Sequence, residues 1–136
     1  MRIAANLSML FNELPLAERV MAARVAGFDG VEIQFPYELP AIRLKELLER
    51  AGLPLVLINL PAGDFMQGGA GLAAVPSRQA EFDAALQDAL TYAAMANPAE
   101  SKCLGDYSSS ATCSEPLISL FNEAPLRTGL EYLVSP

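Results

Sequence analysis

Hydrophobic and polar positions alternate in two different ways along the first part of the chain. In residues 31–35 (VEIQF), apolar side chains alternate with Glu32 and Gln34, which is the two-residue period of a β-strand. Gly27, before this segment, is typical of the position just after a helix, and Pro36, after it, lacks the N–H that a continuing strand needs. The chain repeats this helix-to-strand unit until the pattern fails near residue 97.

The segments between the strands have the period of a helix. Residues 15–26 and 40–51 place apolar side chains three and four positions apart, and a third such segment runs from residue 77 to about residue 96. Gly52 follows the second segment at a position typical of a helix end, and Ser77 is a candidate cap for the third. We therefore predict three helices.

Two further apolar segments complete the pattern. Residues 2–7 (RIAANL) have strand length, and residues 55–60 (LVLINL) are almost continuously apolar, as in a buried parallel strand. Strands then recur at spacings of roughly 24–28 residues, which suits consecutive right-handed parallel units. We predict an α/β fold, a partial (βα) TIM-barrel-like structure of about three βα units in residues 1–96, since a complete barrel needs about 250 residues.

The pattern changes abruptly after the third helix. A fourth strand is due next, but residues 101–115 (SKCLGDYSSSATCSE) are polar, serine-rich and without either period. We therefore divide the chain into N-terminal βα units at residues 1–97 and a divergent, irregular tail at residues 98–136. A shifted reading frame, an altered splice, a fusion scar or a genuine natural tail would each produce such a change.

The composition narrows the class of protein. The chain has 136 residues, 52% of them hydrophobic, which is enough for one domain with a sizeable core. Its 9 basic and 16 acidic residues give a net charge of −7, which argues against nucleic acid and anionic membrane surfaces as partners. We see neither a signal peptide nor an apolar run of membrane-spanning length, so we expect a cytoplasmic location.

The cysteine and histidine content limits the chemistry. Cys103 and Cys113 are the two cysteines. They could form one disulfide, but two cysteines do not make a disulfide framework. The chain contains no histidine, which excludes Ser-His-Asp and Cys-His nucleophile systems and any His-ligated metal site within it. Acid–base chemistry would have to rest on Asp, Glu, Lys, Tyr or a thiol.

Candidate ligand-binding residues follow from the rule that parallel βα folds bind ligands at the carboxyl ends of their strands. The rule selects Asn6 and Ser8 after the first strand, Tyr37 after the second, and Asn59 with the loop 61–78 after the third. The alternative for each is a turn residue that satisfies the local backbone. Asn59 is the strongest candidate, because an amide within an apolar strand must find a partner or cost free energy.

Three charged residues extend this candidate site. Glu32, within a strand, is open to three roles: a base, a metal ligand or a structural anchor between strands. Asp64 and Arg78 lie on either side of the loop glycines, and Arg78 could bind a carboxylate or phosphate through two hydrogen bonds. The alternative for Arg78 is a surface charge near a helix start. The loop glycines do not form a nucleotide-binding fingerprint.

Three stretches resemble a known family: RIAANLSMLFNELPLAERVMAARVAGFDGVEIQFPY, LVLINLPAGD and GLAAVPSRQAEFDAALQDALTYA. They are similar to the N-terminal part of hydroxypyruvate isomerases, xylose-isomerase-like TIM barrels of carbohydrate and glyoxylate metabolism. The resemblance implies interconversion of hydroxypyruvate and tartronate semialdehyde, with 2-oxo-tetronates as substrates of close relatives. It also implies proton transfer next to a carbonyl by two glutamates, with a divalent metal, Mg²⁺ or Mn²⁺, polarising the oxygens.

The resemblance, carried over position by position, implies six residues that shape the pocket for a small 2-keto acid: Asn6, Glu32, Tyr37, Asn59, Asp64 and Arg78. The family's histidine-bearing fourth strand and its later metal-binding and catalytic carboxylates are not matched. We therefore expect no catalytic or metal-binding residue and no cofactor in this chain, and no turnover by the chain alone. The alternative is a non-catalytic partial barrel that self-associates through its uncovered sheet edge.

Overall fold

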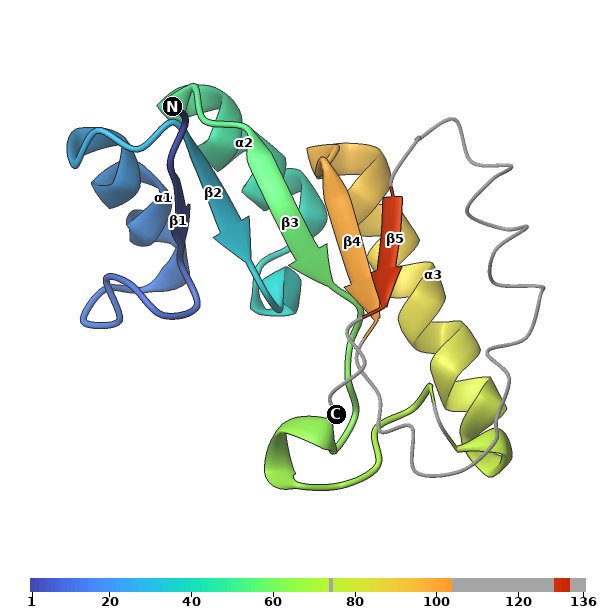
Figure 1. Ribbon diagram of the computed structural model, residues 1–136. Helices are drawn as coiled ribbons and strands as arrows, with labels where there is room; N and C mark the ends of the chain where they lie inside the picture. Colours follow the sequence, from blue (N-terminus) through green and yellow to red (C-terminus); the bar gives the residue numbers. More distant parts are fainter. Residues whose placement is uncertain (74, 104–128, 133–136) are drawn as a thin grey trace.

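The structure, a computed structural model, describes residues 1–73, 75–103 and 129–132 of the chain. Strands and helices alternate along it (Figure 1). The strands are β1 (Ala4–Asn6), β2 (Gly30–Ile33), β3 (Leu55–Asn59), β4 (Glu100–Cys103) and β5 (Gly129–Tyr132). The helices are α1 (Leu16–Val25), α2 (Ala41–Ala51) and α3 (Gln79–Ala96), with the short 3-10 helices η1 (Pro36–Glu38), η2 (Phe65–Gln67) and η3 (Pro76–Arg78).

The strands form one parallel sheet in the order of the sequence, β1-β2-β3-β4-β5. Right-handed crossovers in such a sheet all return on the same side, so one face receives every helix. The helices α1, α2 and α3 indeed all lie behind the sheet in the view of Figure 1. A doubly wound sheet would have helices on both faces, whereas a segment of a βα barrel has them on one. The predicted fold class is confirmed.

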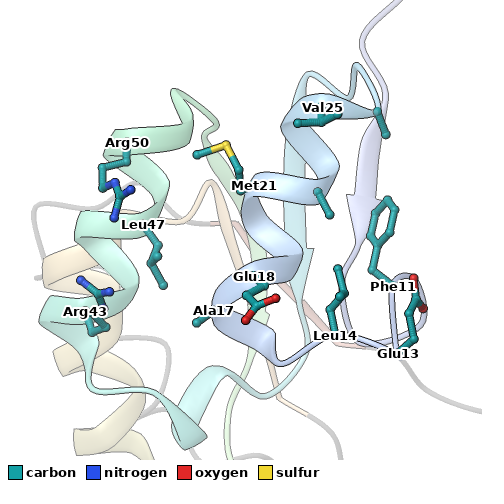
Figure 2. A pocket seen from close by; sticks show the side chains of 12 residues that line it. Phe11, Glu13, Leu14, Ala17, Glu18, Met21, Val25, Arg43, Leu47 and Arg50 are labelled. Atoms are coloured by element: carbon teal, nitrogen blue, oxygen red, sulfur yellow. The ribbon is translucent and has the colours of Figure 1, made fainter.

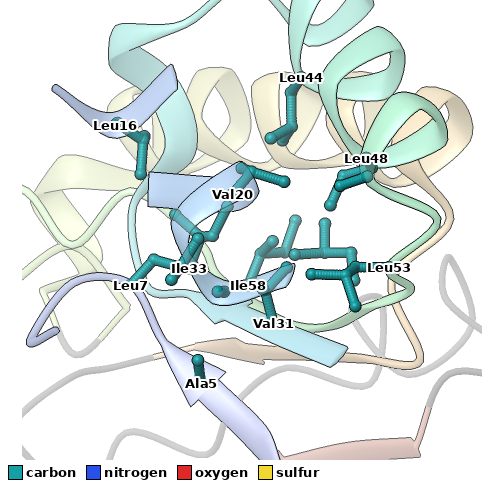
Figure 3. Packing of buried hydrophobic residues seen from close by; sticks show 13 residues of the cluster. Ala5, Leu7, Leu16, Val20, Val31, Ile33, Leu44, Leu48, Leu53 and Ile58 are labelled. Atoms are coloured by element: carbon teal, nitrogen blue, oxygen red, sulfur yellow. The ribbon is translucent and has the colours of Figure 1, made fainter. Parts of the chain in front are cut away.

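The main hydrophobic core lies between the sheet and helices α1 and α2 (Figure 3). Its side chains are at most 6% exposed, and they are Ala5, Leu7, Leu16, Val20, Ala23, Val31, Ile33, Leu44, Leu48, Ala51, Leu53, Leu55 and Ile58. Burying a large aliphatic side chain stabilises a fold by about 1.5–3 kcal/mol relative to leaving it exposed. The core therefore fixes the positions of β1, β2 and β3 relative to one another.

A second, smaller cluster lies against α3. It comprises Leu60, Leu72, Phe82, Ala85, Leu86 and Ala89, so it joins the end of β3 and the loop after it to the helix. Although α3 is the longest helix, no helix in the described part of the chain is long and apolar enough to cross a membrane. The cluster anchors the loop 61–78 at its middle, through Leu72.

Glycines end two of the helices as predicted. Gly27 follows α1 with φ of +88°, and Gly52 follows α2 with φ of +63°, a left-handed conformation that costs glycine little. The predicted cap of the third helix is wrong. Ser77 lies within η3, and Arg78 precedes α3 without a side-chain cap. The 3-10 turn that Pro76 begins moves the cap position by one residue, from Ser77 to Arg78.

β2 is shorter than the predicted segment 31–35. It ends at Ile33, and Pro36 begins η1. The pairing of β2 with β3 shifts between Val31 and Glu32, because Val31 is opposite Leu55 while Glu32 is opposite Leu57. Such a bulge increases the local twist and re-aims the side chain that follows it. In this sheet that side chain is the carboxylate of Glu32.

The structure corrects the expectation that the strand pattern ends near residue 97. Glu100–Cys103 forms β4 in parallel with β3, and Gly129–Tyr132 forms β5 beside it. The pattern missed β4 because its residues, ESKC, are mostly polar and do not alternate, whereas pairing depends on backbone groups. Most of the remaining tail, Cys113 included, lies outside the described residues, so the division of the chain into two parts stays a prediction.

Candidate functional site

The carboxyl ends of β1, β2 and β3 lie side by side at one edge of the sheet, the lower edge in Figure 1. Asn6, Glu32 and Leu57 occupy the same row across the three strands. Residues in register on neighbouring parallel strands project to the same face, here the face opposite the core side chains Val31 and Ile33. The structure therefore places Asn6 and Glu32 side by side in one row of the sheet.

Asn6 and Ser8 both bond to the backbone. The Ser8 N–H donates to Asn6 Oδ1 at 3.0 Å, which is an Asx-turn, and the Gln34 N–H donates to Ser8 Oγ at 2.9 Å. Asn6 thus shapes the turn after β1, and Ser8 ties that turn to the end of β2. This is the turn-residue role that the sequence left open for them. Among residues 1–73 and 75–99, the side-chain NH₂ of Asn6 donates no hydrogen bond.

Glu32 is partly exposed in the middle of this row. The hydrogen bonds and ion pairs among residues 1–73 and 75–99 do not involve its carboxylate. As a structural anchor between strands, the Glu32 carboxylate would need a hydrogen-bond or ion-pair partner, and these residues provide none. The roles of base and metal ligand stay predictions.

Tyr37 and Asn59 meet at the end of β3. The Tyr37 hydroxyl donates to the carbonyl oxygen of Asn59 at 2.6 Å, and the Asn59 N–H donates to the Gln34 carbonyl oxygen at 2.8 Å. Asn59 is only 4% exposed, and no fully buried polar side-chain atom in the described part lacks a hydrogen-bond partner. The Tyr37 hydroxyl and the main chain of Asn59 are thus engaged in hydrogen bonds, which fix the loop after β2 to the end of β3.

A second tyrosine supports this arrangement. The rings of Tyr37 and Tyr92 meet edge to face with centroids 4.9 Å apart, and the Tyr92 hydroxyl donates to the carbonyl oxygen of Leu39. Burial, aided by Tyr92 and Asp88, raises the pKa of Tyr37 above its ordinary value of 10.0, and burial also raises the pKa of Tyr92. Both phenols therefore stay protonated donors at neutral pH.

Arg78 makes its contacts within its own loop and helix. Its guanidinium donates to Asp64 Oδ1 at 2.7 Å and to the Gly71 carbonyl oxygen at 3.2 Å. It also forms a two-bond pair with Glu81, at 3.0 Å and 2.9 Å. The hydrogen bonds from Arg78 lower the pKa of Asp64 and of Glu81, and these bonds raise the pKa of Arg78. An external carboxylate would have to exchange with these two groups.

The glycines of the loop make room for this network. A Cβ on Gly69 would overlap the Asp64 carboxylate, and a Cβ on Gly63 would approach the Leu72 side chain to 2.8 Å. The Gly71 N–H donates to Asp64 Oδ1 at 3.2 Å. The loop is therefore folded around the carboxylate of Asp64, which accounts for its glycine content without a nucleotide.

The sequence prediction missed two residues that hold the loops. Arg19 donates to the carbonyl oxygens of Leu14 at 2.7 Å and Leu7 at 2.8 Å, and so it braces the loop between β1 and α1. A cation near the start of a helix is unfavourable because it opposes the helix dipole, so the position of Arg19 in the sequence could have indicated that it has a specific partner. Glu81, which pairs with Arg78, stands three residues after it, a spacing that also predicts contact.

The described residues do not by themselves fit a divalent metal. Within the part of the chain that the structure describes, no group of three His, Cys, Asp or Glu side chains lies close enough together to hold an ion. Mg²⁺ and Mn²⁺ take about six oxygen ligands. The strand-end row offers the carboxylate of Glu32 and the amide of Asn6.

Known proteins resemble this chain in sequence and in fold. It is 47% identical over 92 residues to the 2-oxo-tetronate isomerase of Haemophilus influenzae, covering 68% of this chain and 36% of the relative. It is 40% identical over 104 residues to the hydroxypyruvate isomerase of Escherichia coli, covering 76% of this chain and 40% of the relative. The crystal structure of an AP endonuclease, family 2, from Brucella melitensis matches with a TM-score of 0.80 and 34% identity, covering 96% of this chain and 54% of that one.

These similarities apply to part of each relative. No family model matches the chain. The chain spans 36% to 40% of the length of the two curated relatives, and the match covers its N-terminal portion. The family that the sequence motifs predict is confirmed for this portion: the N-terminal part of the chain resembles the hydroxypyruvate isomerases and 2-oxo-tetronate isomerases, on a TIM-barrel-like fold.

Proposed function

We propose that this chain carries the substrate-pocket portion of an isomerase for small 2-keto acids, of the type that converts hydroxypyruvate to tartronate semialdehyde. The observation that carries the proposal is the 47% identity to a 2-oxo-tetronate isomerase. In support, Asn6, Glu32 and Asn59 stand at or near the carboxyl ends of neighbouring parallel strands, where βα barrels bind their substrates.

Polar groups give the proposed pocket its specificity. The side-chain amides of Asn6 and Asn59 suit the carbonyl and hydroxyl oxygens of a keto acid. Tyr37 positions the end of β3, because its hydroxyl bonds the Asn59 carbonyl oxygen. Arg78 is suited to bind the substrate carboxylate. Asp64 would position the Arg78 guanidinium until the substrate carboxylate replaces Asp64 as its partner.

We propose further that the residues described here do not complete the reaction alone. Isomerisation removes a proton from the carbon next to a carbonyl and returns it to the neighbouring position. The family resemblance implies two glutamates and Mg²⁺ or Mn²⁺ for this chemistry, the metal serving to polarise the substrate oxygens. In this proposal Glu32 is a residue of the substrate pocket rather than one of these two glutamates. The relatives contain further sequence beyond the matched stretch.

Calorimetric titration with hydroxypyruvate tests the binding part of the proposal. We expect saturable binding that weakens about tenfold in Asn59→Leu, because the apolar side chain offers no hydrogen bond to the ligand. Gln87→Leu removes an exposed amide on α3 and should leave binding unchanged. If the folded wild-type chain does not bind hydroxypyruvate, the proposed substrate pocket is wrong. If the chain forms tartronate semialdehyde with Mg²⁺ or Mn²⁺, only the proposal that it cannot complete the reaction alone is wrong.

Two other functions have weaker support. The Brucella melitensis protein is named as an endonuclease, but 16 acidic against 9 basic residues in this chain do not suit binding to a phosphate backbone. A non-catalytic partial barrel that acts through self-association has one supporting feature. Within the described sheet, β1 pairs on one side only, with β2, so its other edge is open to a further strand.

A further inference from the structure

Helix α1 carries apolar side chains on two of its sides. Leu16, Val20 and Ala23 face the core and are at most 5% exposed. On the outer surface, Met21 is 40% exposed and Val25 is 82% exposed. A helix that is apolar on two sides is typically covered on both, whereas a helix that faces water is polar on its outer side. The outer side of α1 is therefore a candidate for contact with another surface.

A hollow of about 910 Å³ extends along this outer side, from the loop before α1 across that helix, and it includes a groove between α1 and α2 (Figure 2). Helix α1 contributes Ala17, Met21 and Val25 to its lining, and helix α2 contributes Arg43, Leu47 and Arg50. Because Ala17 is small, the groove retains space into which a side chain from outside can fit. In Figure 1, α1 lies at the end of the described sheet, beside β1, so no described helix covers it from the outer side.

The two walls of the groove carry opposite charge. Glu18 lines the α1 side, and Arg43 and Arg50 line the α2 side (Figure 2). Arg43 pairs with Glu46 on its own helix at 2.9 Å, and the two side chains are 49% and 51% exposed. An exposed pair of this kind contributes little to stability, so Arg43 can exchange Glu46 for another carboxylate at low cost.

A groove with one acidic and one basic wall is complementary to a second copy of itself. We propose that the groove between α1 and α2 binds the α1 helix of a second copy of this chain, in a symmetric dimer. About a two-fold axis parallel to the helices, each α1 lies between α1 and α2 of the other copy. Met21 and Val25 then become covered, and Glu18 of each copy approaches Arg43 of the other.

This surface differs from the open edge of β1, and it does not depend on the proposed function. Substrate binding concerns the carboxyl ends of the strands, whereas the groove lies on the helical side of the sheet. The two inferences can therefore fail separately. Hydroxypyruvate titration tests the first, and the association state tests the second.

Sedimentation of the whole chain over a range of concentrations tests the dimer. We expect a monomer–dimer equilibrium whose dissociation constant rises at least about tenfold in Val25→Glu, because the variant places a charge in the covered groove. Ile42→Glu is the matched control, since Ile42 is an exposed apolar residue of α2 outside the groove lining and should leave the equilibrium unchanged. Circular dichroism of both variants establishes that they remain folded.

Charge reversal gives a second, independent readout. Glu18→Arg and Arg43→Glu should each weaken the dimer, and the double variant should restore it, because it inverts the pairing without removing it. Arg24→Glu, on α1 outside the groove lining, is the control and should change little. A monomer at every concentration, an assembly that Val25→Glu does not weaken, or a double variant no better than the singles would each overturn the proposal.

Discussion

The strands and the loop that follows them are stabilised by different forces. β1, β2 and β3 rest on a core whose side chains are at most 6% exposed. The loop 61–78 has Leu72 as its buried apolar anchor, and Arg78 closes it through ion pairs with Asp64 and Glu81. Burial of apolar surface is insensitive to pH and to moderate salt, whereas exposed ion pairs respond to both.

This difference separates the two halves of the candidate site. Asn6, Glu32 and Asn59 are carried by rigid strands, and they should keep their positions for as long as the domain is folded. Arg78 sits on a segment that can open locally without global unfolding. A ligand that binds both halves would therefore order the loop, and changes to the two regions should have distinguishable effects.

The largest expected effect comes from the core. Leu44 is fully buried between the sheet and α2, so Leu44→Ala leaves a cavity and should lower the free energy of unfolding by about 2–5 kcal/mol. Ile42→Ala, on the exposed side of the same helix, should change it by less than about 0.5 kcal/mol. Urea denaturation measures both variants. Equal losses in the two would mean that the core is not where the structure places it.

A smaller effect is expected where the two regions join. Tyr37→Phe removes the hydroxyl that donates to the Asn59 carbonyl oxygen, and it should cost about 0.5–1.5 kcal/mol of unfolding free energy. It should also speed amide exchange in the loop after β2, because that loop loses its bond to the end of β3. Phe11→Leu, at an aromatic pair remote from this site, is a control that should leave that exchange unchanged.

The smallest effect on global stability should come from the ion pairs, which act on the loop alone. The pKa values of Asp64 and Glu81 are lowered in the folded state from 3.8 and 4.5 by the hydrogen bonds from Arg78. Their contribution is therefore fully present above pH 4.5 and is lost as the pH falls through the lowered values. Limited proteolysis of the loop should accelerate in acid and in high salt, while the core resists.

The Asp64→Asn variant provides the control for this prediction. It cannot titrate at position 64, so its cleavage rate should already be raised near neutral pH and should change less on acidification. If the wild-type loop were cleaved at the same rate at pH 3 and at pH 7, with the core folded at both, the ion pairs would not be what closes it.

Sequence periodicity was sufficient for the elements that bury apolar side chains. The helix predicted at residues 40–51 is observed as Ala41–Ala51, because its apolar stripe and Gly52 define both the buried face and the end. β4 escaped prediction, since its polar residues ESKC give no period and the strand is defined by backbone pairing to β3. A local pattern cannot report a pairing that only the assembled sheet creates.

The candidate site shows the same division. The strand-end rule selected Asn6 and Asn59, which lie at the ends of β1 and β3, because the rule depends on topology, and the periodic pattern predicts the topology. The pairing of Asp64 with Arg78 was not predicted, because it joins residues 14 positions apart through a loop without periodic structure. The three-residue spacing of Arg78 and Glu81 can be read from the sequence, but their role in closing the loop depends on the conformation of the loop.

Mapping hydroxypyruvate onto the backbone amides by NMR tests the central claim most directly. We predict that saturating hydroxypyruvate shifts the amide resonances of Asn6, Glu32 and Asn59 and those of the loop 61–78, and leaves α1 and α2 unchanged. The strand ends respond because they carry the proposed pocket, and the loop responds because Arg78 exchanges its carboxylate partners. Shifts confined to the helical side of the sheet, or no saturable shifts at all, would contradict the assignment of this part of the chain as the substrate pocket of a 2-keto acid isomerase.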